Sequence, residues 1–574
     1  MNVLVRLLRE TAAQRRIPPH VVDFAAQHLR QAGRRLRRLV QRARQAPEQA
    51  VVRRSAAAAG APLVVHTDGT WQAAVDFRFS DVRRVTQDTL AAVCRLLEVA
   101  DIAYFVRDAT SAGVSVIGVH DRDRGLVWNA LTAADYDSLL YARAVTGDRA
   151  VALWRGGHVF GELARSERVL VYRNHRVSDA HVVGASHGCV IEFWQRAGDN
   201  LRPPAGATPG RLVLSDLSSA EVVVGGRPYP TLLGLADHRS LLAPTMPIDA
   251  VYTWVDDTDP RWRRSLDRVL TSGRPPLHPE AVNPSRFRNR DELRYSLRSL
   301  SLYADFVRRV FIVTDGQVPT WLDTDRSDVT IIDHSELLDP AHLPTFNSHA
   351  IESRLHHIDG LSEHYLYLND DFMFGRQVTA GTFFTANGLA KMFPDELAPI
   401  PSGPPTTDDR PVDSASKNVR DLMRRHLGMH VRCKMQHVPY PQRRSVLAEM
   451  ERRFPEEFER TAASRFRQPT DVNIPSCFTH YYAFATGRSV PGDIEAEYIN
   501  VGFRWSSLQM RRLLDQRDRD AFCLNETDLQ PAQAASVDRA VQQFLSAYLP
   551  VRSRWERPSD QVSSRKYEAM SVNP

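Results

Sequence analysis

The sequence predicts an α/β fold with a mostly parallel sheet flanked by helices over residues 247–400. Apolar segments of strand length recur there, segments with helical spacing separate them, and polar residues follow the strands at their carboxyl ends. Strands that are apolar throughout are typical of a parallel sheet covered on both faces. The expected strands and helices are, in order, strand 248–255, helix 290–303, strand 309–314, strand 329–333, helix 349–359 and strand 364–369.

With 574 residues, the chain is too long for one hydrophobic core and is expected to form several domains. N-terminal to the α/β core, mixed helical and strand patterns predict an accessory α/β or α+β domain. Its helices are expected at 82–98 and 133–144, and its strands at 102–106, 113–119, 149–154, 158–163, 168–172 and 189–194. The predicted division is a basic helical arm at 1–55, the accessory domain at 62–240, the core at 247–400, a helical C-terminal part at 417–550 and a disordered tail at 558–574.

The charge of the chain is unevenly distributed. Residues 1–54 carry thirteen Arg and three acidic residues, a net +10, whereas the whole chain is only +6. Since the excess lies on a terminal extension and not on the folded body, nucleic-acid binding is disfavoured. Helical spacing of apolar residues in the arm fits a peripheral contact with an anionic membrane; a solvated arm packed on protein is the alternative.

The cysteines argue against both a zinc site and a disulfide framework. The five, Cys94, Cys189, Cys433, Cys477 and Cys523, are widely spaced and include no C-x-x-C pair. No apolar run approaches the roughly 20 residues that span a bilayer, and arginines interrupt the first apolar stretch, unlike a signal peptide. We therefore expect a cytoplasmic protein, with peripheral attachment at the inner face of the cell membrane as an option.

An acidic pair follows one of the predicted core strands. Asp370 and Asp371 come directly after 364–369, which ends in Asn369. Adjacent carboxylates at the edge of a sheet can hold a divalent cation that bridges the phosphates of a nucleotide donor, as in the acidic motif of nucleotide-sugar transferases. An Asp-Asp dipeptide by itself is more often a solvated turn.

Other segments of the chain carry further candidate site residues. Trp254 lies near the end of strand 248–255 and Asp256 directly follows it, and a basic run from Arg286 enters the helix at 290–303. Guanidinium groups suit phosphate oxygens, but the run also fits a well-capped surface helix. His437 precedes a proline-punctuated turn; a lone histidine is usually structural, yet near acids and arginines it becomes a candidate proton acceptor.

Taken in order, these motifs resemble the Stealth family of sugar-phosphate transferases. The counterparts of its four conserved regions are Ile248–Asp256, Arg286 through Trp321, Pro344 through Gly375, and Cys523–Glu526. The resemblance covers about 247–530 and implies transfer of a sugar 1-phosphate from a nucleoside diphosphate sugar, most simply a UDP-sugar, to a hydroxyl of a polysaccharide. It also implies a divalent metal, Mg²⁺ or Mn²⁺, and the compact bacterial type active in exopolysaccharide or capsule synthesis.

By this resemblance, Glu352, Asp371, His437 and Arg467 match residues that the family needs for activity and are the expected catalytic residues, with His437 or Asp371 accepting the proton of the acceptor hydroxyl. The expected substrate-binding residues are Trp254, Asp256, Arg288, Arg294, Asn369 and Arg443. The expected metal ligands are Asp370, Asp371, Asn525 and Glu526.

Two other functions compete with this reading. A metal-dependent glycosyltransferase that releases a nucleoside diphosphate would use a similar acidic pair, whereas the arginine and histidine elements favour phosphoryl transfer. A membrane-recruited assembly factor with a decayed site is the non-enzymatic alternative, and the presence of the acids, His437 and Arg467 counts against it.

Overall fold

The computed structural model describes most of the chain between residues 63 and 557. The gaps within this range are 68–69, 78–82, 109–113, 134–138, 148–149, 154–160, 179–180, 199, 208–217, 237–242, 273–277, 528 and 530. The predicted basic arm, with its membrane contact, and the predicted C-terminal tail lie outside the described residues. Among the described residues, no helix is both long and apolar enough to cross a membrane. All five cysteines are free.

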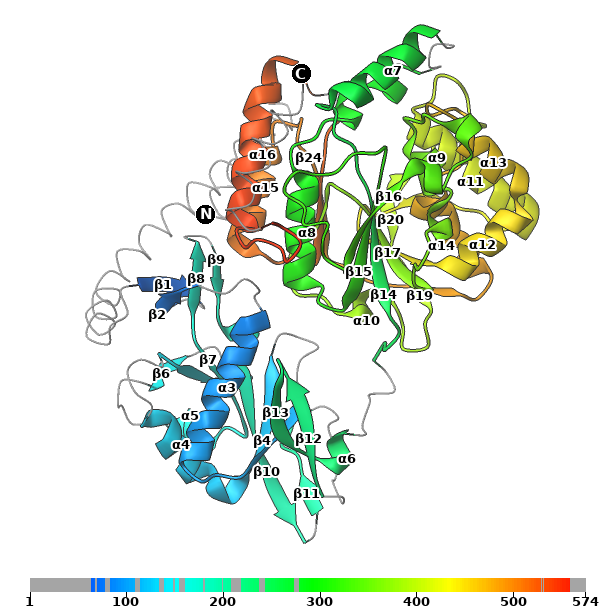
Figure 1. Cartoon of the computed structure of the whole chain (residues 1–574). Helices are drawn as coiled ribbons and strands as arrows, with labels where there is room; N and C mark the ends of the chain where they lie inside the picture. Colours follow the sequence, from blue (N-terminus) through cyan, green and yellow to red (C-terminus); the bar gives the residue numbers. More distant parts are fainter. Residues whose placement is uncertain are drawn as a thin grey trace, which may run out of the picture.

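The N-terminal elements form small sheets with helices beside them (Figure 1). Their helices are α3 (Arg83–Val99), α4 (Arg124–Thr132), α5 (Gly161–Arg165) and α6 (Leu233–Ala236). Their strands are β1 (Leu63–Thr67), β2 (Thr70–Asp76), β3 (Tyr104–Asp108), β4 (Ser115–His120), β5 (Tyr141–Ala144), β6 (Val151–Ala152), β7 (Arg168–Tyr172), β8 (His175–Ser178), β9 (His181–Val183), β10 (Cys189–Ala197), β11 (Asn200–Arg202), β12 (Ser219–Val224) and β13 (Arg227–Leu232). The sheet orders are β1-β2-β8-β9, β3-β4-β10-β7-β5-β6 with β11 on β10, and β12-β13.

Two N-terminal predictions were wrong. Residues 141–144, expected at the end of a helix, form β5, which pairs antiparallel with β7. Residues 161–165, expected in part as a strand, form α5. The cause at β5 is tertiary: Ala142 lies opposite Val171 and both are buried, so cross-strand packing outweighs the local helical pattern.

The C-terminal part is built on a five-stranded sheet of order β16-β15-β14-β17-β22. Its strands are β14 (Ile248–Thr253), β15 (Val307–Thr314), β16 (Val329–Asp333), β17 (His364–Asn369) and β22 (Tyr440–Arg443). The first four are parallel, and β22 runs antiparallel to β17 at the edge. Side chains on β14, β15 and β17 are almost all buried, which explains why these strands read as continuous apolar runs. The α/β class is therefore confirmed.

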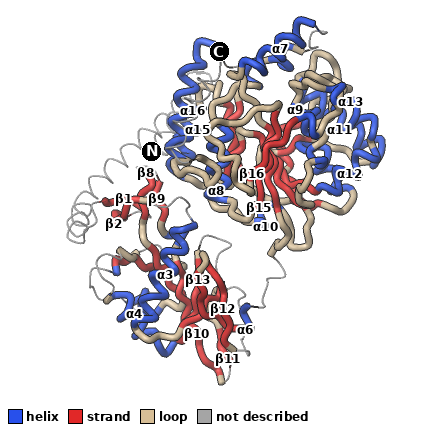
Figure 2. Tube along the Cα trace, in the orientation of Figure 1, coloured by secondary structure: helices blue, strands red, loops and turns tan. Residues whose placement is uncertain are grey.

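Helices cover both faces of this sheet, as Figures 1 and 2 show. α8, α15 and α16 lie on one side, and α9 and α11 to α14 lie on the other. The helices are α7 (Pro260–Ser272), α8 (Glu292–Tyr303), α9 (Ser348–Glu352), α10 (Ala380–Phe383), α11 (Pro411–Leu427), α12 (Arg444–Arg453), α13 (Pro455–Ala462), α14 (Thr479–Ala485), α15 (Ser506–Gln516) and α16 (Ala534–Tyr548). The predicted helix at 349–359 is thus broken into α9 and the 3₁₀ turn η9 (Leu355–His357).

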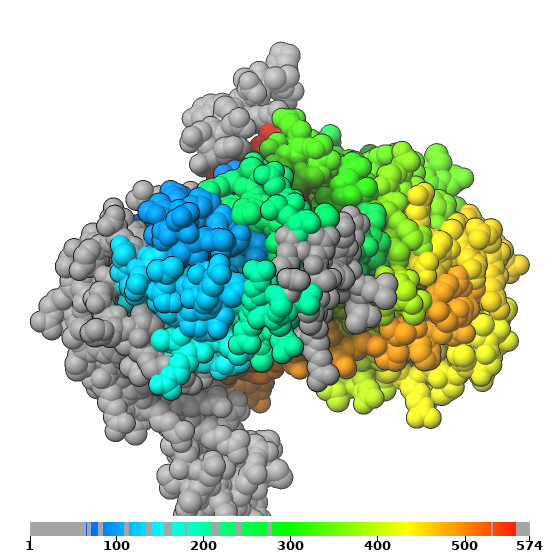
Figure 3. All heavy atoms as spheres, turned by 90° about the horizontal axis from the view of Figure 1, so that it is seen from below, coloured from blue at the N-terminus to red at the C-terminus, as the bar shows by residue number. Residues whose placement is uncertain are grey.

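Short strands complete the C-terminal part. They are β18 (Phe372–Phe374), β19 (Ala390–Met392), β20 (Pro394–Pro399), β21 (Cys433–Met435), β23 (Ser489–Pro491), β24 (Ala496–Asn500) and β25 (Ala521–Asn525). The sheet β18-β25-β24 matters most for the site, because β18 follows the acidic pair directly and β25 pairs with it. In the view of Figure 3, the N-terminal elements lie beside the C-terminal ones. The predicted domain limits stay a prediction.

Candidate active site

A cleft of about 1660 Å³ opens at the carboxyl end of the parallel strands. Thr253 and Asn369, at the ends of β14 and β17, lie opposite each other in the sheet, so the residues after them share one edge. Trp254, Asp370 and Asp371 line the cleft for this reason. Carboxyl edges of open α/β sheets are where such folds bind ligands.

Asp371 is held in place from β25. Its Oδ2 accepts hydrogen bonds from Asn525 Nδ2 and Cys523 Sγ, both at 3.3 Å. Its Oδ1 is buried and has no hydrogen-bond partner. Burial raises the pKa of Asp371 to about 6, against the opposing effect of these hydrogen bonds. One oxygen is therefore positioned by the protein, and the other is left for a ligand.

Glu292 adds a third carboxylate to the acidic pair. It begins α8, lines the cleft and is buried. Burial raises the pKa of Glu292 to about 7, although Arg290 opposes the shift. Burial, then Glu292 and Asp371, raise the pKa of Asp370 well above its usual range. Glu292 was not predicted as a site residue, because no sequence signal shows that the first turn of α8 faces Asp370.

Two arginines meet at another part of the cleft. Arg286 and Arg467 both line it, and each is surrounded by protein. Burial, and next the charge of Arg467, lower the pKa of Arg286 well below its usual value. Arg467 Nη2 donates to Ser348 Oγ at 2.7 Å, while its Nε is buried without a hydrogen-bond partner. Two crowded guanidinium groups of this kind favour an anion between them.

Glu352 lies beside this pair at the end of α9. It is buried, and its Oε2 has no hydrogen-bond partner. Burial raises the pKa of Glu352, and the charge of Arg467 opposes that shift. The nearby hydroxyls of Tyr367 and Ser348 also oppose the shift. The structure thus brings Glu352 and Arg467 together.

His437 lies on the wall of the same cleft because β22 is antiparallel. Tyr440, at the start of β22, pairs with Tyr367 near the carboxyl end of β17, so the residues just before β22 reach the active edge. The ring of His437 packs 4.9 Å from that of Tyr498 and 6.0 Å from that of Phe372, measured between centroids. Its side chain is open to the cleft. Desolvation of the ring by the cleft wall, and next the charge of Lys434, lower the pKa of His437 to about 4. Its imidazole is therefore neutral at pH 7.

Three of the predicted substrate-binding residues line the cleft: Trp254, Arg288 and Asn369. The amide of Asn369 is oriented by Tyr367, whose hydroxyl donates to its Oδ1 at 2.8 Å. Arg288 is partly engaged, since its Nη1 lies 3.4 Å from Glu526 Oε1.

The other three are not brought to the cleft lining. Arg443 pairs with Glu363 at 3.0 Å and lies opposite His364, at the far end of β17, because β22 runs away from the active edge. Arg294 pairs with Glu556 at 2.7 Å. Asp256 stabilises its own turn: its Oδ1 accepts hydrogen bonds from Thr258 N at 3.0 Å and from Thr258 Oγ1 at 2.7 Å.

The metal ligands predicted on β25 have other partners. Both oxygens of Glu526 accept from arginines, Oε1 from Arg288 and Oε2 from Arg290. Asn525 donates to Asp371 and accepts from Tyr498 OH at 3.3 Å. These residues therefore support the cleft wall and are not free ligands.

Asp370 and Asp371 remain suitable for Mg²⁺ or Mn²⁺. Mg²⁺ is typically bound through one or two carboxylates together with the phosphates of a substrate. The unpartnered Oδ1 of Asp371 and the crowding of carboxylates at Asp370 fit such a cation. Oxygen donors alone also suit hard ions better than zinc.

Comparison with known proteins gives a consistent result. Four conserved regions of Stealth proteins match the chain: region 1 at residues 246–274, region 2 at 286–392, region 3 at 436–484 and region 4 at 511–567. Region 2 spans both Arg286–Trp321 and Pro344–Gly375, which were expected as separate regions, and region 3 holds His437 and Arg467. That division of the middle part was wrong. Ile248–Asp256 falls in region 1 and Cys523–Glu526 in region 4, as expected for the first and last regions.

Curated relatives extend over most of the chain. The exopolysaccharide phosphotransferase SCO6023 of Streptomyces coelicolor is 43% identical over 82% of this chain and 82% of the relative. The exopolysaccharide phosphotransferase CpsY of Mycobacterium tuberculosis is 34% identical over 82% of this chain and 88% of the relative. An exopolysaccharide phosphotransferase of Nocardia farcinica is 35% identical over 80% of this chain and 88% of the relative. The similarity therefore includes much of the N-terminal part, which carries none of the four matched regions.

Proposed function

The chain belongs to the Stealth family of phosphotransferases, and from this premise we propose that it transfers a sugar 1-phosphate from a nucleoside diphosphate sugar to a hydroxyl of an exopolysaccharide. The product is a phosphodiester, and a nucleoside monophosphate leaves. The names of the relatives support the acceptor class. A nucleotide-sugar transferase-like arrangement of the core is part of the same proposal.

The pair Arg286 and Arg467 is the observation that carries this proposal. Both line a cleft that also holds carboxylates, so cationic and anionic groups occupy different parts of one cavity. A diphosphate placed between the two guanidinium groups would relieve their mutual repulsion and satisfy Arg467 Nε. Asp370 and Asp371 would hold a divalent cation that offsets part of the charge of the phosphates.

The reaction breaks one phosphorus–oxygen bond and forms another. The acceptor hydroxyl attacks the phosphorus that bears the sugar, and the bond from this phosphorus to the bridging oxygen breaks, so that the nucleoside monophosphate leaves with that oxygen. Arg467 and Arg286 stabilise the negative charge on the nonbridging oxygens. A bound divalent ion, held by Asp370 and Asp371, would neutralise part of the same charge.

The hydroxyl proton passes to His437 in this proposal. Its imidazole is neutral at pH 7 and open to the cleft, so it can accept a proton. The phosphates of the bound donor raise its pKa from about 4 toward the working pH. Glu352 lies beside Arg467, and its charge keeps the Arg467 guanidinium oriented.

The released nucleotide tests the proposal directly. Purified protein is incubated with UDP-sugars, a polysaccharide acceptor and Mg²⁺ or Mn²⁺, and the nucleotide product is identified chromatographically. We expect UMP together with a phosphodiester signal in the ³¹P NMR spectrum of the polymer. Release of UDP without UMP would instead establish the competing glycosyltransferase. The Glu352→Gln variant serves as the background control.

A further inference from the structure

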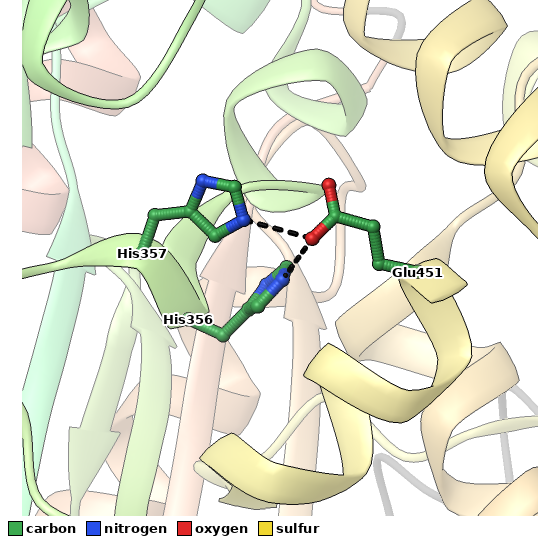
Figure 4. A group of neighbouring side chains, drawn as sticks. All are labelled: His356, His357 and Glu451. Atoms are coloured by element: carbon green, nitrogen blue, oxygen red, sulfur yellow. Dashed lines mark hydrogen bonds and ion pairs between the residues drawn. The ribbon is translucent and has the colours of Figure 1, made fainter. Parts of the chain in front are cut away.

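Two histidines and a glutamate converge outside the cleft (Figure 4). His356 and His357, in the 3₁₀ turn η9, both direct their Nε2 atoms at Oε2 of Glu451 on α12. The distances are 2.7 Å from His356 and 2.8 Å from His357. Among the described residues, this is the one group of three His, Cys, Asp or Glu whose ligand atoms all lie within 4.8 Å of one another. None of the three lines the cleft.

The second oxygen of Glu451 is already held by the protein. Arg354 donates from Nη1 to Glu451 Oε1 and from Nη2 to Glu459 Oε2, the latter at 2.8 Å. Carboxylates that bind metals are commonly oriented by hydrogen bonds of this type. Arg354 therefore fixes the carboxylate so that Oε2 faces the two imidazoles.

We propose that His356, His357 and Glu451 bind a divalent ion of the zinc class, with water in the fourth position. Two imidazoles and one carboxylate form a ligand set that zinc accepts, and imidazole nitrogens select it over Mg²⁺. Ligand atoms about 2.0–2.2 Å from a tetrahedral ion stand roughly 3.3 Å apart. The present 2.7 and 2.8 Å spacings thus need to open by about half an ångström.

Access and anchoring are consistent with this site. The side chain of His357 is 42% exposed, which gives an ion and its water a route from solvent, whereas that of His356 is 2% exposed and fixed in position. The ion would join η9 to α12, and η9 follows shortly after α9, which carries Ser348 and Glu352. Sequence reasoning about zinc considered only the cysteines, and histidines adjacent in sequence gave no spacing typical of a zinc motif.

Zinc titration of the full, untagged chain tests the site. The Asp371→Asn variant is used as the background, because it removes the charge of one of the two carboxylates proposed to hold the cleft cation. After chelator treatment and dialysis, Zn²⁺ binding is measured by calorimetry and by metal content, and Co²⁺ serves as an absorption probe. We expect one tight equivalent and a rise in the thermal unfolding midpoint.

Matched histidine variants identify the ligands. His357→Gln, at the exposed ligand, should weaken Zn²⁺ binding at least about 10-fold and remove the thermal shift. His342→Gln is the control, since His342 also pairs with a glutamate, Glu459 at 3.2 Å, in the same network but lies outside the group of three. It should bind as the background protein does. Glu451→Gln provides a second loss-of-ligand variant.

Two results would overturn the site. One is the absence of a stoichiometric Zn²⁺ equivalent in the Asp371→Asn protein, which leaves a hydrogen-bonded cluster that ties η9 to α12 without an ion. The other is equal Zn²⁺ affinity in the His357→Gln and His342→Gln proteins, which places the bound ion elsewhere. Neither result depends on the sugar-phosphate transfer proposed above.

Discussion

Replacing Arg467 by lysine tests the anion site most sharply. Lysine keeps the positive charge but lacks the planar fork of donors that matches phosphate oxygens. In the structure, Nη2 of Arg467 is engaged with Ser348 and Nε is unpartnered, so Nε and the remaining Nη donors are available to the substrate. Losing one or two hydrogen bonds to a charged group, each about 1.5–3 kcal/mol, predicts a loss near 3 kcal/mol in transition-state stabilisation. This corresponds to an approximately 10²-fold lower kcat/KM.

The assay follows nucleoside monophosphate release at several donor concentrations. Arg465→Lys is the matched control, because Arg465 is two residues away, exposed, and donates only to the backbone oxygens of Ala341 and Leu343, at 3.3 and 3.1 Å. We expect this control to retain wild-type kcat/KM. If Arg467→Lys stays within about threefold of wild type while folded, the assignment of Arg467 to transition-state charge is wrong.

Three further predictions follow from the cleft. His437→Gln should lower kcat by about 10²-fold and, at saturating donor and metal, remove from the pH profile of kcat the acidic limb that reflects protonation of the base in the donor complex; a retained limb assigns the base elsewhere. Asp371→Asn should abolish turnover yet raise the free energy of unfolding at pH 8 by about 1–2 kcal/mol. The folded-state pKa of Asp371, about 6, lies above the ordinary value of 3.8, so the wild type loses stability as pH rises through that window, and the neutral amide avoids the loss. Denaturant melts at pH 4 and pH 8 measure this, and a larger gain at pH 4 would contradict it. Arg443→Ala should change kcat/KM by less than about twofold and cost at most about 1 kcal/mol of stability, because it breaks only a part-exposed pair with Glu363; a large drop in kcat/KM with unchanged melting would restore it to the site.

Local sequence patterns predicted much of the central sheet. The strands at 329–333 and 364–369 were predicted at the bounds of β16 and β17, because buried parallel strands leave an uninterrupted apolar run followed by polar residues. The same reasoning placed Asp370 and Asp371 at the carboxyl edge. It failed where pairing partners are remote, as at β5, whose strand character depends on β7.

The site residues also divide into those that the sequence could identify and those that only remote contacts decide. Glu352, His437 and Arg467 were named through family resemblance, and the structure brings all three to one cleft. Arg443 and Arg294 belong to equally basic segments, yet each faces a carboxylate away from that cleft. Residue type alone does not distinguish a substrate-binding arginine from one in a structural ion pair, since both need an anion beside them.

The sequence by itself determined the α/β class, the strand edge that carries the acids and the set of residue types needed for phosphoryl transfer, because these depend on periodicity and order along the chain. Only the tertiary structure decided which side chains meet. The antiparallel direction of β22 brings His437 to the active edge and carries Arg443 away from it. The N-terminus of α8 sets Glu292 beside Asp370, and the fold sets Arg286 beside Arg467 and joins His356 and His357 to Glu451. These contacts link residues distant in sequence, so the packing of whole elements determines them and no local pattern records them.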